Sequence, residues 1–201
     1  MKNIALVGVL FVLALWFNCA KGKAIGNKNI THPSEPVSQS SGAIEDSLKN
    51  PYDTKCADGE CSTFVFLKNG TRIFATEYSK EPSCRLVSQN LLKILMSCGS
   101  PCNYTLFVNL TSGAISIPFF MALAIDTLHE YVAFCDTSKI KIAAIFDSAK
   151  APIAINRPFS QTATMSSVVD TAIFRNNGLF VFHYYAGKDF VGTWDSLEIT
   201  F

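Results

Sequence analysis

The sequence has few of the residues and motifs that mark an enzyme. Only three histidines occur, His32, His129 and His183. No phosphate-binding loop, dinucleotide fingerprint, HExxH zinc motif or G-x-S-x-G elbow is present. We therefore predict no catalytic residue, no metal site and no cofactor. A hydrolase acting on glycans or other envelope polymers stays an alternative, because paired carboxylates are brought together only by the fold.

Runs of basic residues are also missing. The 201 residues include 17 Lys and Arg against 16 Asp and Glu. Removing residues 1–24 takes away Lys2, Lys21 and Lys23, so 14 basic residues face 16 acidic ones and the net charge is −2 (14 − 16). Phosphate-backbone binding requires clustered Lys and Arg. The charge pattern therefore predicts no nucleic-acid partner.

No apolar run is long enough to form a membrane-spanning helix. The longest unbroken one, residues 4–17, has fourteen residues (4 through 17), whereas a spanning helix needs about 20. A short apolar run that follows Lys2 and precedes small residues is typical of a signal peptide. We assign the signal peptide to residues 1–24, and we predict no transmembrane segment in the mature chain.

A signal peptide places the mature chain in the periplasm or outside the cell. Lipid anchoring through Cys19 is disfavoured, because a lipoprotein signal has a small residue before its cysteine and Asn18 stands there. Residues 25–54 carry three prolines, several serines and few large apolar groups. Such a segment buries too little to offset its ordering entropy. We predict a flexible polar leader over 25–54 and a single β-rich domain over 55–201.

Turn chemistry in the domain predicts β-hairpins. Asn69-Gly70 and Asn177-Gly178 each lie between two strand-like runs, and Asn-Gly supplies the positive φ that a tight hairpin turn requires. Polar loops within residues 104–118 and 131–146 give the same pattern. The predicted fold is mainly β, with antiparallel meander sheets built from hairpins, at most one short helix, and disulfide bridges.

Side-chain alternation predicts which faces are buried. In residues 102–110 one face is apolar, whereas Asn103, Thr105, Phe107 and Asn109 form a face that we predict to be wetter. Residues 179–185, LFVFHYY, are apolar on both faces and indicate a central strand. Residues 84–96 are ambiguous. Their apolar spacing favours a short helix that breaks into a strand near Lys93, and a strand is the alternative.

Six cysteines follow the signal peptide, and an even number in an exported chain indicates disulfides. They are Cys56, Cys61, Cys84, Cys98, Cys102 and Cys135. The pairs 56–61 and 98–102 are close enough to close turns, which leaves 84–135 by elimination. A redox pair at 98–102 is disfavoured, because the spacing is not C-x-x-C and the following residues are β-patterned. Zinc binding is disfavoured because neither spacing is the common knuckle.

The densest aromatic cluster lies in residues 182–194. Aromatic anchors beside a turn suit a protein or carbohydrate partner, and the alternative is that they form the core of a small β domain. The candidate binding residues are His183, Tyr184, Tyr185, Asp189 and Trp194. His183 is also a candidate general base, with Asp189 or Asp195 as its helper, although a core histidine is the commoner role.

The sequence as a whole favours binding over catalysis. We expect an exported, non-catalytic binding module, such as an inhibitor, an immunity protein or a host-interaction protein. The two alternatives are the secreted hydrolase and a structural component of the envelope.

Overall fold

The computed structural model describes residues 50–200 except 101, 137–138 and 162–166. All of these residues belong to the compact unit that runs from Ser40 to Phe201. The predicted signal peptide and most of the predicted leader lie outside the described residues. Strand β1 (Tyr52–Ala57) begins inside the segment predicted as leader, so residues 52–54 belong to the fold. In the described ranges no helix is long and apolar enough to cross a membrane.

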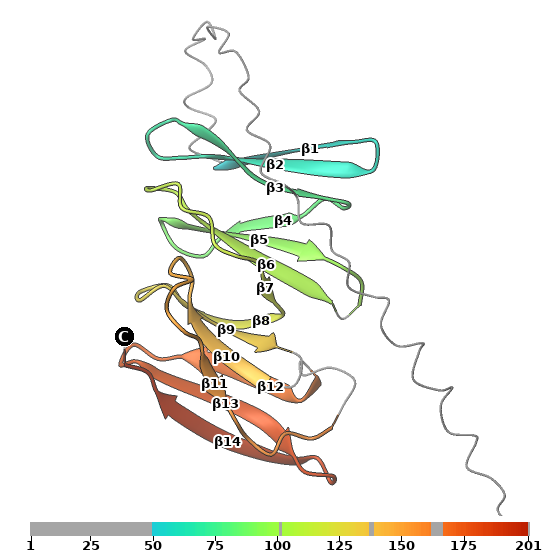
Figure 1. Cartoon of the computed structure of the whole chain (residues 1–201), viewed down its shortest axis with the longest axis vertical. Helices are drawn as coiled ribbons and strands as arrows, with labels where there is room; N and C mark the ends of the chain where they lie inside the picture. The colour runs from blue at the N-terminus through green and yellow to red at the C-terminus, as the bar shows by residue number, and fades with distance from the viewer. Residues whose placement is uncertain (1–49, 101, 137–138, 162–166, 201) are drawn as a thin grey trace, which may run out of the picture. The chain divides into compact units, whose positions relative to one another are not determined.

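The chain forms four antiparallel meander sheets (Figure 1), so the predicted fold class is confirmed. The first sheet contains β1, β2 (Glu60–Phe66) and β3 (Arg72–Tyr78). The second contains β4 (Ser83–Leu86), β5 (Leu91–Ser97), β6 (Asn103–Asn109) and β7 (Phe119–Phe120). The third contains β8 (Ala122–Asp126), β9 (Tyr131–Asp136), β10 (Lys139–Ala144) and β11 (Ile153–Ile155). The fourth contains β12 (Val169–Phe174), β13 (Leu179–Ala186) and β14 (Val191–Glu198).

Both Asn-Gly hairpins form where the sequence predicts them. Gly70 has a φ of +83° in the turn between β2 and β3, and the Thr71 amide donates to the side chain of Asn69 at 2.9 Å. Gly178 has a φ of +77° in the turn between β12 and β13. The predicted central strand is β13, which lies between β12 and β14.

The short helix favoured for residues 84–96, breaking into a strand near Lys93, is wrong, and the strand alternative is correct. This segment forms β4 and β5, which pair with Cys84 opposite Ile94, and the Val87 amide donates to the Leu91 carbonyl at 2.9 Å in the turn between them. Strand β5 has leucine or isoleucine on both faces, and Lys93, which shares a face with Leu91 and Leu95, is partly buried. A strand of this kind loses the polar–apolar alternation that distinguishes it from a helix.

Three apolar clusters join the sheets in chain order, and each is formed by two neighbouring sheets. Between the first and second sheets lie Val65, Leu67, Leu92, Ile94, Met96, Leu106, Val108 and Leu110. Between the second and third lie Leu91, Phe107, Phe119, Val132, Ala143 and Ile145. The largest cluster, between the third and fourth, includes Tyr131, Ala133, Ile140, Ile142, Phe180, Phe182 and Tyr184. Each inner sheet is therefore covered on both faces.

This stacking overturns the wetter face predicted for β6. Leu106 and Val108 face the first sheet, but Thr105 and Phe107, on the opposite side, are also buried. Asn109 lies at the strand end, where its side-chain amide donates to Glu130 at 3.2 Å. Asn103 is partly buried at the other end of the strand. Side-chain alternation correctly predicts which residues of β6 share a face, but it does not show that a second sheet covers the face predicted to be polar.

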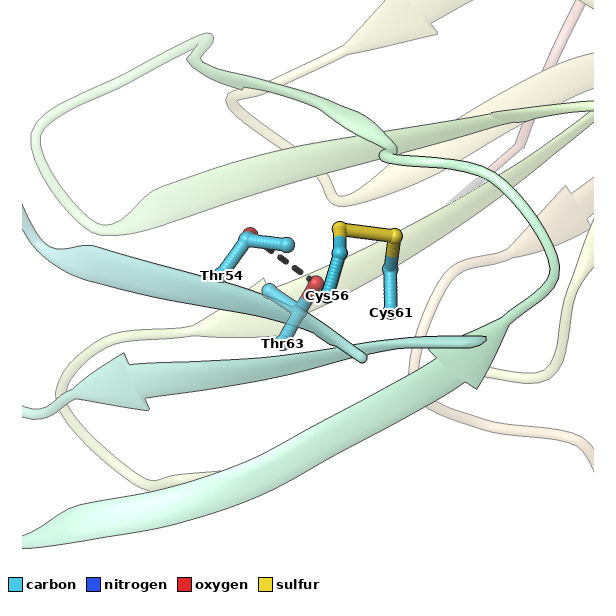
Figure 2. The surroundings of a disulfide bond; sticks show 4 residues. All are labelled: Thr54, Cys56, Cys61 and Thr63. Atoms are coloured by element: carbon cyan, nitrogen blue, oxygen red, sulfur yellow. Dashed lines mark hydrogen bonds between the residues drawn. A yellow bond between two sulfur atoms is a disulfide. The ribbon is translucent and has the colours of Figure 1, made fainter. Parts of the chain in front are cut away.

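Two of the three expected disulfides are present. Cys56–Cys61 bridges β1 and β2 with an S–S distance of 2.05 Å. The hydroxyls of Thr54 and Thr63, which lie 3.1 Å apart, are beside it on the same face of the first sheet (Figure 2). Cys98–Cys102 closes the turn between β5 and β6.

The pairing of Cys84 with Cys135 is wrong, because both thiols are free. Cys84 lies on β4 and packs against the cluster between the first and second sheets. Cys135 lies on β9 in the cluster between the third and fourth sheets. The two thiols therefore point to different layers of the stack.

We expect cysteine mapping of the unreduced chain to give two populations after residue 24. Burial raises the pKa of the Cys84 and Cys135 thiols to about 11, so few thiolates are present at pH 8 and iodoacetamide should alkylate them slowly in the native protein. After denaturation without reductant, both should be labelled and the four bridged cysteines should not. A disulfide-linked peptide pair containing Cys84 and Cys135 would contradict this assignment.

Candidate binding face on the fourth sheet

Strand β13 divides the predicted aromatic cluster between two faces. Phe180, Phe182 and Tyr184 point toward the third sheet and are buried. Their rings stack at centroid distances of 5.3 and 5.5 Å, and the Phe159 ring meets Tyr184 edge-on at 5.0 Å. Tyr184 is therefore a core residue and does not belong to an exposed surface, contrary to the grouping made from the sequence.

The opposite side of the fourth sheet, which we call the outer face, packs against none of the other three sheets. Its strand residues are those with the parity of His183 in the three registers. They are Thr171, Ile173, Leu179, Val181, His183, Tyr185, Gly192, Trp194, Ser196 and Glu198. Three of the candidate binding residues, His183, Tyr185 and Trp194, lie on this face, whereas Asp189 does not.

A row of three side chains crosses the outer face from strand to strand. His183 on the central strand is paired with Thr171 on β12 and with Trp194 on β14. The His183 ring lies 4.9 Å from the Trp194 ring and 5.5 Å from the Tyr185 ring. Trp194 is 63% exposed. The row therefore presents the exposed ring of Trp194 to solvent, and His183 packs against this ring.

Asp170 adds a carboxylate beside this row. It lies at an irregularity between β12 and β13, where its Oδ2 is 3.4 Å from His183 Nδ1 and accepts a hydrogen bond from the Thr171 hydroxyl at 3.3 Å. The His183 Nδ1 atom is buried, and it has an ion-pair distance to Asp170 but no hydrogen bond. The Asp170 side chain is 56% exposed, so it remains accessible to a ligand.

Gly192 lets the imidazole lie close to β14. A Cβ at this position would stand 2.8 Å from His183 Nε2 and 3.1 Å from Cε1. Any larger residue would require the ring to move, so the present arrangement of the row depends on glycine. A β-strand glycine often marks such a close approach.

The aspartates proposed as helpers of His183 lie elsewhere. Asp189 is in the exposed turn between β13 and β14. Asp195 has the opposite parity on β14 and pairs with Arg157. The hydrogen bond from Arg157 lowers the pKa of the Asp195 carboxyl. Asp170, which is not among the residues predicted from the sequence, is the carboxylate that lies beside His183.

Two other pairs of titratable residues lie outside the fourth sheet. Asp126 and His129 form a pair at 2.8 Å in the turn between β8 and β9, where Asp126 also accepts from two turn amides. On the first sheet, hydrogen bonding and repulsion from Glu60 raise the pKa of Glu77, and both residues are exposed. No group of three or more potential metal ligands occurs among the described residues.

Part of this arrangement could have been predicted from the sequence. The Asn177-Gly178 turn fixes the pairing of β12 with β13, and that pairing puts Thr171 and Ile173 on the outer face with His183. The irregularity that turns Asp170 toward His183 has no sequence signal that we recognise. No family model and no curated protein matches the chain.

Proposed function

We propose that this protein is an exported, non-catalytic binding module and that the outer face of the fourth sheet is its recognition surface. The observation that carries the proposal is Trp194, which is 63% exposed and yet packed against His183 in an ordered row. Tryptophan and tyrosine dominate binding energy where they are displayed as rigid anchors. Two disulfides support export, because such bonds persist in oxidising compartments.

The described residues give the hydrolase alternative less support. Glycosidases use two carboxyl groups that flank the scissile bond, one of them with a raised pKa. In the neighbouring pair Glu60 and Glu77, Glu60 raises the pKa of Glu77, but both residues are exposed to solvent and the pair does not lie in an enclosed site. Asp126 is buried and its oxygens are occupied by the turn that it closes. Binding is therefore the function that the described geometry favours.

Affinity capture with matched baits tests this proposal. Wild-type protein, Trp194→Ala and Phe74→Ala would each be immobilised and exposed to extracts of the native organism and its surroundings, with retained proteins and glycans identified by mass spectrometry. Phe74 is the control because it is 51% exposed but lies on the first sheet. We expect a ligand that wild type and Phe74→Ala retain and Trp194→Ala loses, and that binds again when purified. Retention that is independent of Trp194, or turnover of the captured ligand, would overturn the proposal.

A further inference from the structure

We propose, building on the proposed function, that the ligand of the outer face is a neutral oligosaccharide of pyranose rings. Trp194 would act as the stacking platform and Asp170 as a hydrogen-bond acceptor. The inference comes from the juxtaposition of an exposed indole, an accessible carboxylate and the strand surface between them.

The exposed indole suits the apolar side of a sugar ring. The face of an aromatic ring carries partial negative charge and attracts the partly positive hydrogens of C–H groups. A pyranose ring presents C–H groups on its flat side and hydroxyls at its rim, so it covers an aromatic ring without burying its hydroxyls. His183 packs against Trp194 at an interplanar angle of 44°. This contact restricts the indole before any ligand arrives, which lowers the entropy cost of binding.

The carboxylate of Asp170 suits the hydroxyl rim of such a ligand. An ionised carboxylate accepts hydrogen bonds and donates none. Hydrogen bonds to an ionised acceptor are about twice as strong as those between neutral groups. The Thr171 hydroxyl donates a hydrogen bond to one oxygen of Asp170, which lies 3.4 Å from His183 Nδ1. Because more than half of the side chain is exposed, acceptor sites remain for ligand hydroxyls.

The width of the row indicates an oligosaccharide rather than a single sugar. Thr171 and Trp194 are on strands β12 and β14, with His183 on the strand between them. Two strand spacings amount to about 10 Å, which is wider than one pyranose ring. A ligand that covers the row from Trp194 to Thr171 therefore needs more than one pyranose ring. The row lies on an open sheet surface, which suits internal units of a chain that crosses the strands.

The charge beside the row selects against anionic ligands. Asp170 supplies a carboxylate there, and the strand residues of this face include no Lys or Arg, whereas Glu198 lies at the other end of the face, where Leu179 separates it from the adjoining Arg175. Arg157 pairs with Asp195, whose parity places it on the inner side of the sheet. Phosphates and uronic acids therefore meet repulsion here, whereas a neutral glycan does not. A hydrophobic protein partner would instead be expected to use Ile173, which is 42% exposed, and its neighbour Val181.

Tryptophan fluorescence tests the proposal directly, because the chain has only Trp16 and Trp194. In the full chain carrying Trp16→Phe, Trp194 is the sole emitter. We would titrate this protein with neutral hexasaccharides of glucose, N-acetylglucosamine, mannose and galactose, with the four monosaccharides, and with polygalacturonate. We expect a saturable emission change with at least one hexasaccharide, affinity at least tenfold weaker for its monosaccharide, and no binding of polygalacturonate. The absence of saturable binding to every hexasaccharide would overturn the proposal.

Matched variants then locate the site by calorimetry with the hexasaccharide that binds. Trp194→Ala and Asp170→Ala should each weaken binding about tenfold or more, whereas Phe74→Ala on the first sheet should leave the affinity unchanged. Undiminished binding by Trp194→Ala, or a tenfold loss from Ile173→Ala with none from Asp170→Ala, would overturn the assignment. If a captured protein needs Trp194 and no glycan binds, the oligosaccharide inference fails and the proposed binding function stands. If neither binds through Trp194, both fail.

Discussion

Replacing Phe182 with alanine is expected to lower the free energy of unfolding by about 3–5 kcal/mol. The Phe182 side chain is fully buried between the third and fourth sheets. Its ring stacks on Phe180 at 5.3 Å and on Tyr184 at 5.5 Å. Truncation removes buried apolar surface and leaves a cavity between the third and fourth sheets. The strands on either side are paired within their own sheets and cannot easily move to close it. Urea unfolding followed by circular dichroism measures the loss as a lower midpoint with an unchanged slope.

Trp194→Ala is the matched control for this experiment, because it removes a larger ring from the other side of the same sheet. Trp194 is 63% exposed, so we expect its removal to cost less than about 1 kcal/mol, as for other surface positions. The contrast checks the face assignment on which the binding site depends. A loss from Trp194→Ala as large as that from Phe182→Ala would mean that the outer face is buried and unavailable to a ligand.

The Asp126→Ala variant is expected to lose about 2–3 kcal/mol of stability. Asp126 is buried, and its carboxylate accepts hydrogen bonds from the amides of Leu128 and His129 at 2.9 and 3.1 Å. It also contacts the His129 ring at 2.8 Å. Alanine leaves these turn groups without their acceptor, and an unsatisfied buried polar group costs more than a hydrogen bond contributes. Thermal or urea unfolding measures the difference.

Asp147 provides the comparison for Asp126, because it plays the same part in an exposed turn. Its side chain accepts one hydrogen bond, from the Ala149 amide at 3.1 Å. Asp147→Ala should therefore cost less than about 1 kcal/mol, since water replaces the lost acceptor. Asp126→Asn retains one oxygen acceptor and should fall between the two alanine variants. Equal losses at positions 126 and 147 would contradict the view that burial of Asp126 sets the cost.

Local chemistry in the sequence predicted the features that depend on a few neighbouring residues. Asn69-Gly70 and Asn177-Gly178 each produced a hairpin, because positive φ is required within two or three residues of the turn. The pairs Cys56–Cys61 and Cys98–Cys102 formed for the same reason, since a short separation leaves little choice of partner. The antiparallel β class follows from many such signals acting together.

The candidate site was predictable only in part. His183, Tyr185 and Trp194 were recognised as an aromatic cluster and do share the outer face. The position of the turn beside this cluster also predicts Tyr184 among the binding residues, but adjacent strand residues point to opposite faces and Tyr184 lies in the core. Asp170 entered the site through an irregular pairing, which no residue pattern announces.

By itself, then, the sequence determined the β-rich class, the hairpin turns, the two short-range disulfides and the alternation of side chains along each strand. Only the tertiary structure decided which sides of the strands are covered. It placed Cys84 and Cys135 in different layers, buried Thr105 and Phe107, and left the Trp194 side of the last sheet open. The reason is the separation along the chain of the residues that interact. Turn geometry is fixed within a few residues, whereas the burial of a sheet face depends on apolar surfaces that are distant in the chain and meet only when the sheets stack.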